Sequence, residues 1–267
     1  MDVARLEAVS KAFGAVRAVD RLSLTLKQGE ILGFLGTNGA GKTTTIKMLL
    51  GFFRPDAGRL TVWDGDPCEP AARRMIGYMP ETAYYYPYLN VRELLAFYGG
   101  LCGMPKPLIR ARSEELIERV GLKEAGGRLL RHYSKGMLQR AGIAQALLHD
   151  PSLLILDEPF TGLDPLARIQ LRDLILEQKR QGKTVFFSSH ELSEAELICD
   201  RVAILKQGAL VWSGAVSDVA GDGQQNLERV FLKMLGNDGE AAARQSHALH
   251  GKKTGAPPRA AEGEAGP

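Results

Sequence analysis

The stretch GTNGAGKTTT, residues 36–45, decides the fold of this chain. It follows an apolar run, EILGFLG, which predicts a buried strand, and it leads into TTTIKMLLG, which predicts a helix. The stretch fits the pattern G-x-x-x-x-G-K-[S/T], and a strand before it and a helix after it are the context in which this pattern forms a phosphate-binding loop. A glycine-rich turn with a chance lysine is the alternative, and this context disfavours it.

Each residue type in the loop suits phosphate binding for a physical reason. Gly36, Gly39 and Gly41 allow a tight turn in which successive backbone N–H groups point at phosphate oxygens. The following helix adds its positive end. We expect Lys42 to reach the β- and γ-phosphates and the Thr43 hydroxyl to ligate Mg²⁺. The predicted phosphate-binding residues are Gly36, Thr37, Asn38, Gly39, Ala40, Gly41, Lys42, Thr43 and Thr44.

A second stretch, LLILDEP (residues 153–159), supplies acidic groups of the kind that such a loop needs. Its four apolar residues predict a buried strand, and Asp157 stands at the end, where a carboxylate can hold Mg²⁺ through water. Glu158 comes next and is a candidate general base for an attacking water. A strand followed by an acidic helix cap is the alternative when the stretch is taken alone.

Strands and helices alternate along most of the chain, which indicates an α/β sheet covered by helices. Near the N-terminus, VARLEAV and RLSLTLK alternate apolar and polar residues and predict strands. Between about residues 82 and 150 the pattern is helical, so we expect a helical subdomain inserted in a single domain of residues 1–236. Residues 237–267 contain one leucine and no Ile, Val, Phe, Trp or Tyr, which predicts a disordered tail.

Composition excludes several classes of protein. Of the 267 residues, 45% are apolar and 24% are charged, as in an ordinary globular protein. The net charge is only +3, so no nucleic-acid partner is expected. No stretch approaches the roughly 18 apolar residues of a membrane span, and the first residues lack the apolar core of a signal peptide. The three cysteines have no metal-ligand spacing, and we expect a cytoplasmic protein.

Four stretches in this order, GTNGAGKTT, YSKGMLQR, LLILDEPFTGLDP and SSH, resemble the ATP-binding cassette of ABC transporters. The resemblance covers residues 3 to about 236. A phosphate-binding loop alone occurs in many unrelated NTPases, whereas the four stretches together are specific to this family. The resemblance implies the α/β P-loop NTPase fold of ABC ATPases, with an antiparallel β subdomain and an inserted α-helical subdomain. It also implies ATP and Mg²⁺ as ligands.

This resemblance implies a role for RHYSKGMLQR, residues 131–140. Ser134 predicts an N-cap for the helix that follows, whose positive end and free N–H groups would point outward. In the family the matching signature segment closes over the ATP of a second cassette, with Ser134 and Gly136 in the matching positions. Lys135 and Met137 depart from the usual Gly and Gln. An ordinary capped helix is the alternative when the decapeptide is taken alone.

Matching to the family implies roles for four more residues. Phe13 falls where an aromatic ring stacks on adenine, with a plain core phenylalanine as the alternative. Asp164, in TGLD, matches the loop between the two ATP sites, and His190 matches the switch histidine that contacts the γ-phosphate. Glu81 stands where the family usually has glutamine. This Pro-Glu form resembles an exporter-like branch, and a carboxylate there adds like charge near the phosphates.

The resemblance implies the ATP-binding and ATP-hydrolysing subunit of an ABC transporter, with Glu158 and His190 as catalytic residues. We expect a homodimer or heterodimer of such subunits, peripheral on the cytoplasmic face of the cell membrane. It would power transport, with export favoured, through a separate transmembrane permease. A soluble ABC ATPase in cofactor assembly or another non-transport role is the alternative. A nucleotide-gated regulatory module is a weaker one, because it would not need the two catalytic residues.

Four of the seven tyrosines lie in ETAYYYPYLN, residues 81–90. Their spacing fits neither a strand with one buried face nor a helix, and the proline among them favours a loop. We therefore expect at least two of the four rings to be exposed or half-buried. In the family this stretch lies beside the cleft that receives a permease helix, so we interpret the tyrosines as part of a docking surface. A loop packed on its own helical subdomain is the alternative.

Overall fold

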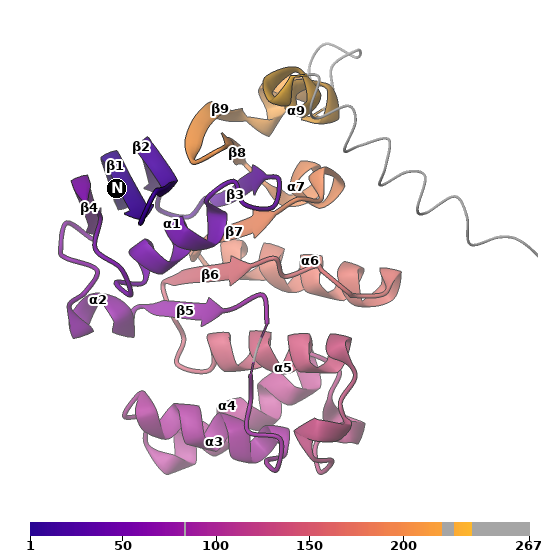
Figure 1. Cartoon of the computed structure of the whole chain (residues 1–267). Coiled ribbons are helices and arrows are strands. Elements are labelled where there is room, and N and C mark those ends of the chain that lie inside the picture. Colours follow the sequence, from indigo (N-terminus) through magenta and orange to yellow (C-terminus); the bar gives the residue numbers. More distant parts are fainter. Residues whose placement is uncertain (83, 221–226, 237–267) are drawn as a thin grey trace, which may run out of the picture.

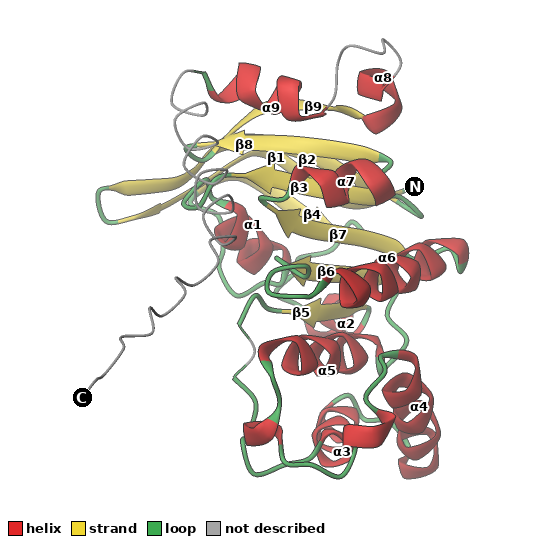
Figure 2. Ribbon diagram, turned by 90° about the vertical axis from the view of Figure 1, so that its right-hand side faces the viewer, coloured by secondary structure: helices red, strands yellow, loops and turns green. Residues whose placement is uncertain are grey.

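The computed structural model describes residues 1–82, 84–220 and 227–236 (Figure 1). The predicted disordered tail, residues 237–267, lies outside the described residues. Figures 1 and 2 show a small sheet and a larger sheet, with a group of helices at one end.

The small sheet is antiparallel, and its alternating sequence explains why it has one buried face. In the second strand, Leu22, Leu24 and Leu26 are buried while Ser23 between them is exposed, as the predicted period of two requires. The predicted antiparallel β subdomain is therefore confirmed. The strands lie in the order β2-β1-β4, and they are β1 (Asp2–Phe13), β2 (Val16–Lys27) and β4 (Ala57–Val62).

The larger sheet has the order β5-β6-β7-β3-β8-β9 in the described part of the chain, with β9 antiparallel to β8 and the other pairs parallel. Its strands are β3 (Ile31–Gly36), β5 (Ile76–Met79), β6 (Leu153–Asp157), β7 (Thr184–Ser189), β8 (Arg201–Lys206) and β9 (Ala209–Ala215). Every residue of β3, β6 and β7 is buried, as their apolar runs predict. The carboxyl ends of these strands lie side by side, with Asp157 opposite Ser188 and Leu35 opposite Ser189.

Helices cover both faces of the larger sheet (Figures 1 and 2). α1 (Lys42–Leu49) shares a core with the small sheet on one face, and α6 (Pro165–Arg180) and α7 (Leu192–Ile198) pack on the other. No helix within the described ranges is both long and apolar enough to cross a membrane. The remaining helices around the sheet are α2 (Pro70–Arg74), α8 (Val216–Ala220) and α9 (Leu227–Leu235). Of these, α2 and α8 are too short for a periodic pattern to predict them.

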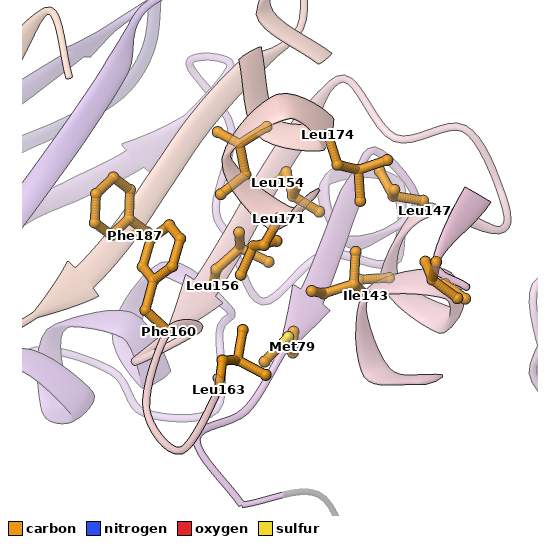
Figure 3. Close-up of a cluster of buried hydrophobic side chains, with 14 of the residues drawn as sticks. Met79, Ile143, Leu147, Leu154, Leu156, Phe160, Leu163, Leu171, Leu174 and Phe187 are labelled. Atoms are coloured by element: carbon orange, nitrogen blue, oxygen red, sulfur yellow. The ribbon is translucent and has the colours of Figure 1, made fainter. Parts of the chain in front are cut away.

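The inserted helical segment lies between β5 and β6 in the sequence and at the lower end of Figure 1. It shares one core with the sheet, because Ile143 and Leu147 pack beside Met79 and Leu156 (Figure 3). A Cβ on Gly77 of β5 would lie 2.1 Å from the carbonyl oxygen of Ala146, so only glycine permits this approach. The segment comprises α3 (Val91–Leu101), α4 (Lys106–Arg119), α5 (Lys135–Leu147) and the 3₁₀ turns Lys123–Ala125 and Leu130–His132.

The tyrosine-rich loop divides its rings between solvent and core. Tyr84, Tyr86 and Tyr88 are exposed by 93%, 60% and 72%, which confirms the expectation of at least two exposed rings. Tyr85 differs from them, because it packs against the core and its ring lies edge-on to that of Tyr98. Burial raises the pKa of its hydroxyl, which has no hydrogen-bond partner among the described residues. Tyr85 therefore anchors the loop on the helical segment.

Two matched substitutions test this anchor. We expect Tyr85→Phe to leave the free energy of unfolding unchanged or to raise it by up to about 1 kcal/mol, because a buried unpaired hydroxyl is removed. Tyr133→Phe is the control, since the buried Tyr133 hydroxyl donates to the Ala125 carbonyl oxygen at 2.9 Å. Its loss should cost about 1 kcal/mol. Urea unfolding measures both, and an equal loss in the two variants would contradict the placement of Tyr85.

Candidate functional site

The predicted phosphate-binding loop joins β3 to α1, and its glycines serve two different purposes. Gly39 and Gly41 have φ angles of 79° and 103°, which glycine adopts without strain. A Cβ on Gly41 would also lie 2.4 Å from the carbonyl oxygen of Ala18. A Cβ on Gly36 would lie 2.8 Å from the carbonyl oxygen of Leu205, so close packing requires glycine there. A Cβ on Gly36 would also lie 2.9 Å from the Cβ of Ala40 in the same loop, so Gly36 is needed for the tight turn as well.

Lys42 is the first residue of α1, and its ammonium group points back into the loop. Nζ donates to the Gly36 carbonyl oxygen at 2.7 Å and lies 3.1 Å from Glu158 Oε1. The lysine and glutamate side chains are only 6% and 7% exposed. A buried ammonium without such partners would cost several kcal/mol. This contact brings together the two motifs that the sequence presents more than a hundred residues apart.

Asp157 is the last residue of β6 and is 1% exposed. Ser188 of β7 donates its hydroxyl to Asp157 Oδ1 at 2.6 Å and accepts the N–H of Glu158 at 2.9 Å. Burial raises the pKa of Asp157, while hydrogen bonds from the hydroxyls of Ser188 and Thr43 oppose that rise. The structure therefore brings together the two predicted metal ligands, Thr43 and Asp157.

This oxygen set fits Mg²⁺. The ion prefers oxygen ligands, and proteins usually hold it with one or two carboxylates together with substrate phosphates and water. In residues 1–82, 84–220 and 227–236, no three or more His, Cys, Asp or Glu side chains gather into a complete metal site. The hydroxyl of Thr43 and the carboxylate of Asp157 would be the protein's share of the ligands, and phosphate oxygens and water would be the rest.

Glu158 lies between the side chains of Lys42 and His190, directly after β6. Its φ of 51° is unusual for a residue other than glycine. His190 Nδ1 lies 2.8 Å from Oε2, and Lys42 Nζ lies near the other oxygen. Burial alone would raise the pKa of Glu158, but the hydrogen bond with His190 and the charge of Lys42 outweigh it and lower this pKa. The same hydrogen bond raises the pKa of His190, against the effect of its partial burial. Glu158 is therefore a carboxylate at neutral pH.

A cavity of about 710 Å³ opens over the loop and is lined by residues 37–44 together with Glu81 and Glu158. The structure thus brings Glu81 to the predicted phosphate-binding residues. Phe13 is outside this lining, and its ring is 45% exposed and lies edge-on to that of Phe53, with centroids 5.3 Å apart. The adenine contact of Phe13 stays a prediction. The remaining lining residues are Val16, Arg17, Ala18 and Gln207.

Ser134, Gly136 and Asp164 form a second group, outside the lining of this cavity. Ser134 caps α5, because its hydroxyl oxygen accepts the N–H of Met137 at 3.3 Å. Asp164 caps α6 in the same way and accepts the N–H of Ala167 at 2.8 Å. Ser134 and Asp164 are both exposed. The predicted site residues therefore fall into one set around the loop and another set at helix ends on the surface.

Two polar residues for which no role was predicted hold these parts together. Gln139 of α5 donates from Nε2 to the carbonyl oxygens of Glu158 at 3.2 Å and Pro159 at 3.0 Å. The helix that begins after Ser134 is thereby tied to the end of β6. Ser188 is the second such residue, and the pair of serines that ends the strand TVFFSS was the one available signal for it.

Known proteins that are similar to this chain belong to one family. A family model described as ABC transporter matches residues 19–161. An uncharacterized ABC transporter ATP-binding protein of Nostoc sp. is 46% identical over 224 residues, which are 80% of this chain and 67% of the relative. The bacitracin transport ATP-binding protein BcrA of Bacillus licheniformis is 42% identical over 206 residues, which are 76% of this chain and 66% of the relative. The chain thus spans about two thirds of the length of these two relatives.

A solved structure described as the ATP-binding subunit of an ABC transporter is also similar. It is 30% identical, with a TM-score of 0.80 over 87% of this chain and 99% of that chain. This likeness confirms the predicted α/β fold with its antiparallel and helical parts.

The contact between Glu158 and His190 predicts a pH-dependent stability for the nucleotide-free protein. The pKa of Glu158 is lowered, so its contribution is full above its ordinary value of 4.5 and is lost as pH falls through the lowered pKa. The pKa of His190 is raised, so its contribution is full below the ordinary value of 6.5 and is lost as pH rises through the raised pKa. The pair therefore stabilises the fold most between these two values.

Urea unfolding of the wild type and of His190→Gln tests this window. The difference in the free energy of unfolding should be larger near pH 5.5, inside the window of 4.5 to 6.5, than at a pH well above the raised pKa of His190. His132→Gln, at an exposed histidine outside the site, is the control. A difference for His190→Gln that is the same at both pH values would contradict the pairing.

Proposed function

The chain belongs to the family of ABC transporter ATP-binding proteins, and we propose that it binds ATP with Mg²⁺ at residues 36–44, hydrolyses the ATP and powers transport through a separate membrane permease. The observation that carries this proposal is the position of the Glu158 carboxylate, between Lys42 and His190 and beside Asp157. The bacitracin relative has the name of a transport protein, and no observation favours the soluble cofactor-assembly alternative.

Phosphate binding would use groups that the loop already presents. The positive end of α1 and the backbone N–H groups of the loop attract an anion, and Lys42 adds an ammonium charge. In the structure this ammonium pairs with Glu158. A γ-phosphate would compete for Lys42, and the Glu158 carboxylate would then be free to accept a hydrogen bond from the attacking water.

Hydrolysis would proceed with Glu158 as the base. The water oxygen bonds to the γ-phosphorus while the water proton passes to the Glu158 carboxylate. The bond between the γ-phosphorus and the bridging oxygen breaks, and ADP and inorganic phosphate leave. His190, whose pKa is raised, would present a positive charge to the γ-phosphate. Mg²⁺, held by Thr43 and Asp157, would neutralise charge on the phosphates when it is bound.

The surface position of Ser134, Gly136 and Asp164 supports a dimer. The free N–H groups and positive end of α5 lie outside the cavity that Lys42 enters, so they cannot serve the ATP of their own subunit in this arrangement. They suit the phosphates of an ATP held by a partner subunit, which can be identical or different. Each ATP would then contact both subunits, and hydrolysis would require the dimer.

A cleft of about 910 Å³ beside the tyrosine-rich loop is the proposed permease surface. Tyr84, Tyr85 and Tyr98 line it together with Arg73 and Arg74. Tyrosine suits a surface that a partner covers, because it adds apolar area and keeps a polar tip. In this proposal the protein lies peripherally on the cytoplasmic face of the cell membrane. Export is the direction that the Pro-Glu form at residue 81 favours by resemblance.

Replacement of Glu158 tests the hydrolytic proposal. Glu158→Gln should keep ATP binding but lower turnover by about a hundredfold or more, because an amide cannot accept the proton of water. It should also accumulate as an ATP-bound dimer on size exclusion. Glu177→Gln is the control, since it makes the same change at a carboxylate outside the cavity lining. Glu177 pairs with Arg119 instead. Wild-type turnover in Glu158→Gln would show that Glu158 is not the base.

Replacement of single exposed tyrosines tests the docking surface. Tyr84 lines the cleft, whereas Tyr88, which is also exposed, does not. Tyr85 is unsuitable for this test because it is packed against the core. Tyr84→Ser should keep basal ATPase activity and melting temperature and weaken permease binding by about 2 kcal/mol, or roughly thirtyfold. Tyr88→Ser should bind as the wild type does. Full retention of the permease by Tyr84→Ser in co-purification would refute docking through this ring.

A further inference from the structure

Arg168, in the first turns of α6, joins two segments beside the proposed catalytic centre. Its Nε donates to the carbonyl oxygen of Leu163 at 3.2 Å, in the loop at residues 161–164. Its terminal nitrogens pair with both carboxylate oxygens of Glu191, with Nη2 at 2.9 Å from Oε1 and Nη1 in contact with Oε2. This two-point contact fixes the orientation of the carboxylate as well as its position.

Glu191 follows His190 in the chain and is held from a second side. Its N–H donates to Ser189 Oγ at 2.8 Å, and Ser189 is the last residue of β7. The turn that carries His190 is therefore fixed by β7 on one side and by the contact with Arg168 on the other. From this turn, His190 reaches the carboxylate of Glu158 at 2.8 Å.

Two more charged residues enclose the contact. The Glu194 side chain is 7% exposed, with Oε1 3.7 Å from Arg168 Nη1 and Oε2 3.4 Å from Arg172 Nε. Two arginines thus face two glutamates at a partly buried place. Such clusters contribute little net stability, because desolvation of the charges offsets their attraction. The planar fork of arginine instead gives a defined geometry that a lysine or an apolar contact would not reproduce.

We propose that Arg168 is a positioning residue for ATP hydrolysis. It fixes the position of the turn that carries His190 relative to the loop at residues 161–164. The inference rests on the proposed hydrolytic function. Asp164 caps the same helix by accepting the N–H of Ala167. A movement of this loop at a subunit contact would therefore be carried through α6 and Arg168 to His190.

Kinetics of full-length variants give the first test. Arg168→Met should lower kcat about tenfold or more and change the KM for ATP less than about twofold, since a misplacement of about 1 Å can cost a hundredfold in rate. Arg168→Lys keeps the charge without the fork and should also lower kcat. Arg119→Met is the matched control, because Arg119 is 26% exposed against 27% for Arg168 and also pairs with α6, through Glu177. Wild-type kcat in Arg168→Met would overturn the inference.

A double-mutant cycle separates pairing from general damage. If Arg168 acts through Glu191, the variant Arg168→Met with Glu191→Gln should have the same kcat as Arg168→Met alone. This double variant also restores the charge balance, so it answers the objection that an unpaired glutamate has unfolded the turn. If the fold-loss of kcat in the double variant equals the product of the fold-losses in the two single variants, the proposed pairing is overturned.

A spectroscopic test does not need turnover. An NMR titration of protein that contains ¹³C-labelled histidine measures the pKa of His190. The His190 imidazole signal is assigned as the one that is missing in His190→Gln. The charged groups that face it are Glu158 at the end of β6, Lys42 of α1 and the adjacent Glu191. Removal of the positive charge of Arg168 would by charge alone raise the pKa of His190. Separation of His190 from Glu158 would lower it, so the two effects have opposite signs.

We expect the pKa of His190 to fall in Arg168→Met and to stay unchanged in Arg119→Met. An unchanged or raised pKa in Arg168→Met would overturn the inference. A wild-type protein that binds but does not hydrolyse ATP would contradict the proposed function instead, and the titration would still decide whether Arg168 positions His190.

Discussion

The complete burial of three parallel strands is the constraint on which the site depends. Strands β3, β6 and β7 have helices or the small sheet on both faces, so no residue within them faces water. Buried polar groups on these strands need hydrogen-bond partners, and most of them lie at the carboxyl ends, where they can pair with one another. Asp157 and Ser188 do so directly, and Lys42 closes over the same edge from α1. The proposed site residues Lys42, Asp157 and Glu158 therefore meet at this edge.

The charges at this edge pair with one another. Lys42 and Glu158 are both buried, and either alone would carry a large desolvation cost. Their pairing, together with the hydrogen bond from His190, removes much of that cost and keeps Glu158 ionised. A phosphate that takes over Lys42 would replace one anion by another. The proposed base and the proposed phosphate-binding lysine thus lie close together.

Close packing links the helical segment to the edge of the sheet at which Asp157 and Glu158 lie. The segment shares its hydrophobic core with β5 and β6, and Gly77 brings β5 against α5 with no room for a side chain. Gln139 adds a directional link from α5 to the carbonyl oxygens that follow β6. Beside Gly142 of α5, Tyr85 attaches the exposed tyrosine-rich loop to the same core. Contacts at that loop and at the start of α5 are therefore mechanically connected to the position of Glu158.

The sequence by itself determined the parts whose signal is local. The glycine pattern at residues 36–41 and the apolar run before Asp157 predicted the loop, the buried strands and the edge at which they meet, because turns and burial depend on neighbouring residues. Only the tertiary structure decided which side chains meet across that edge. The contacts of Ser188, Gln139 and Arg168 could not be predicted, since each residue acts on a group that the sheet or helix packing brings to it. Tyr85 likewise turns inward because Gly142 of α5 leaves space beside it, which no pattern of neighbouring residues could reveal.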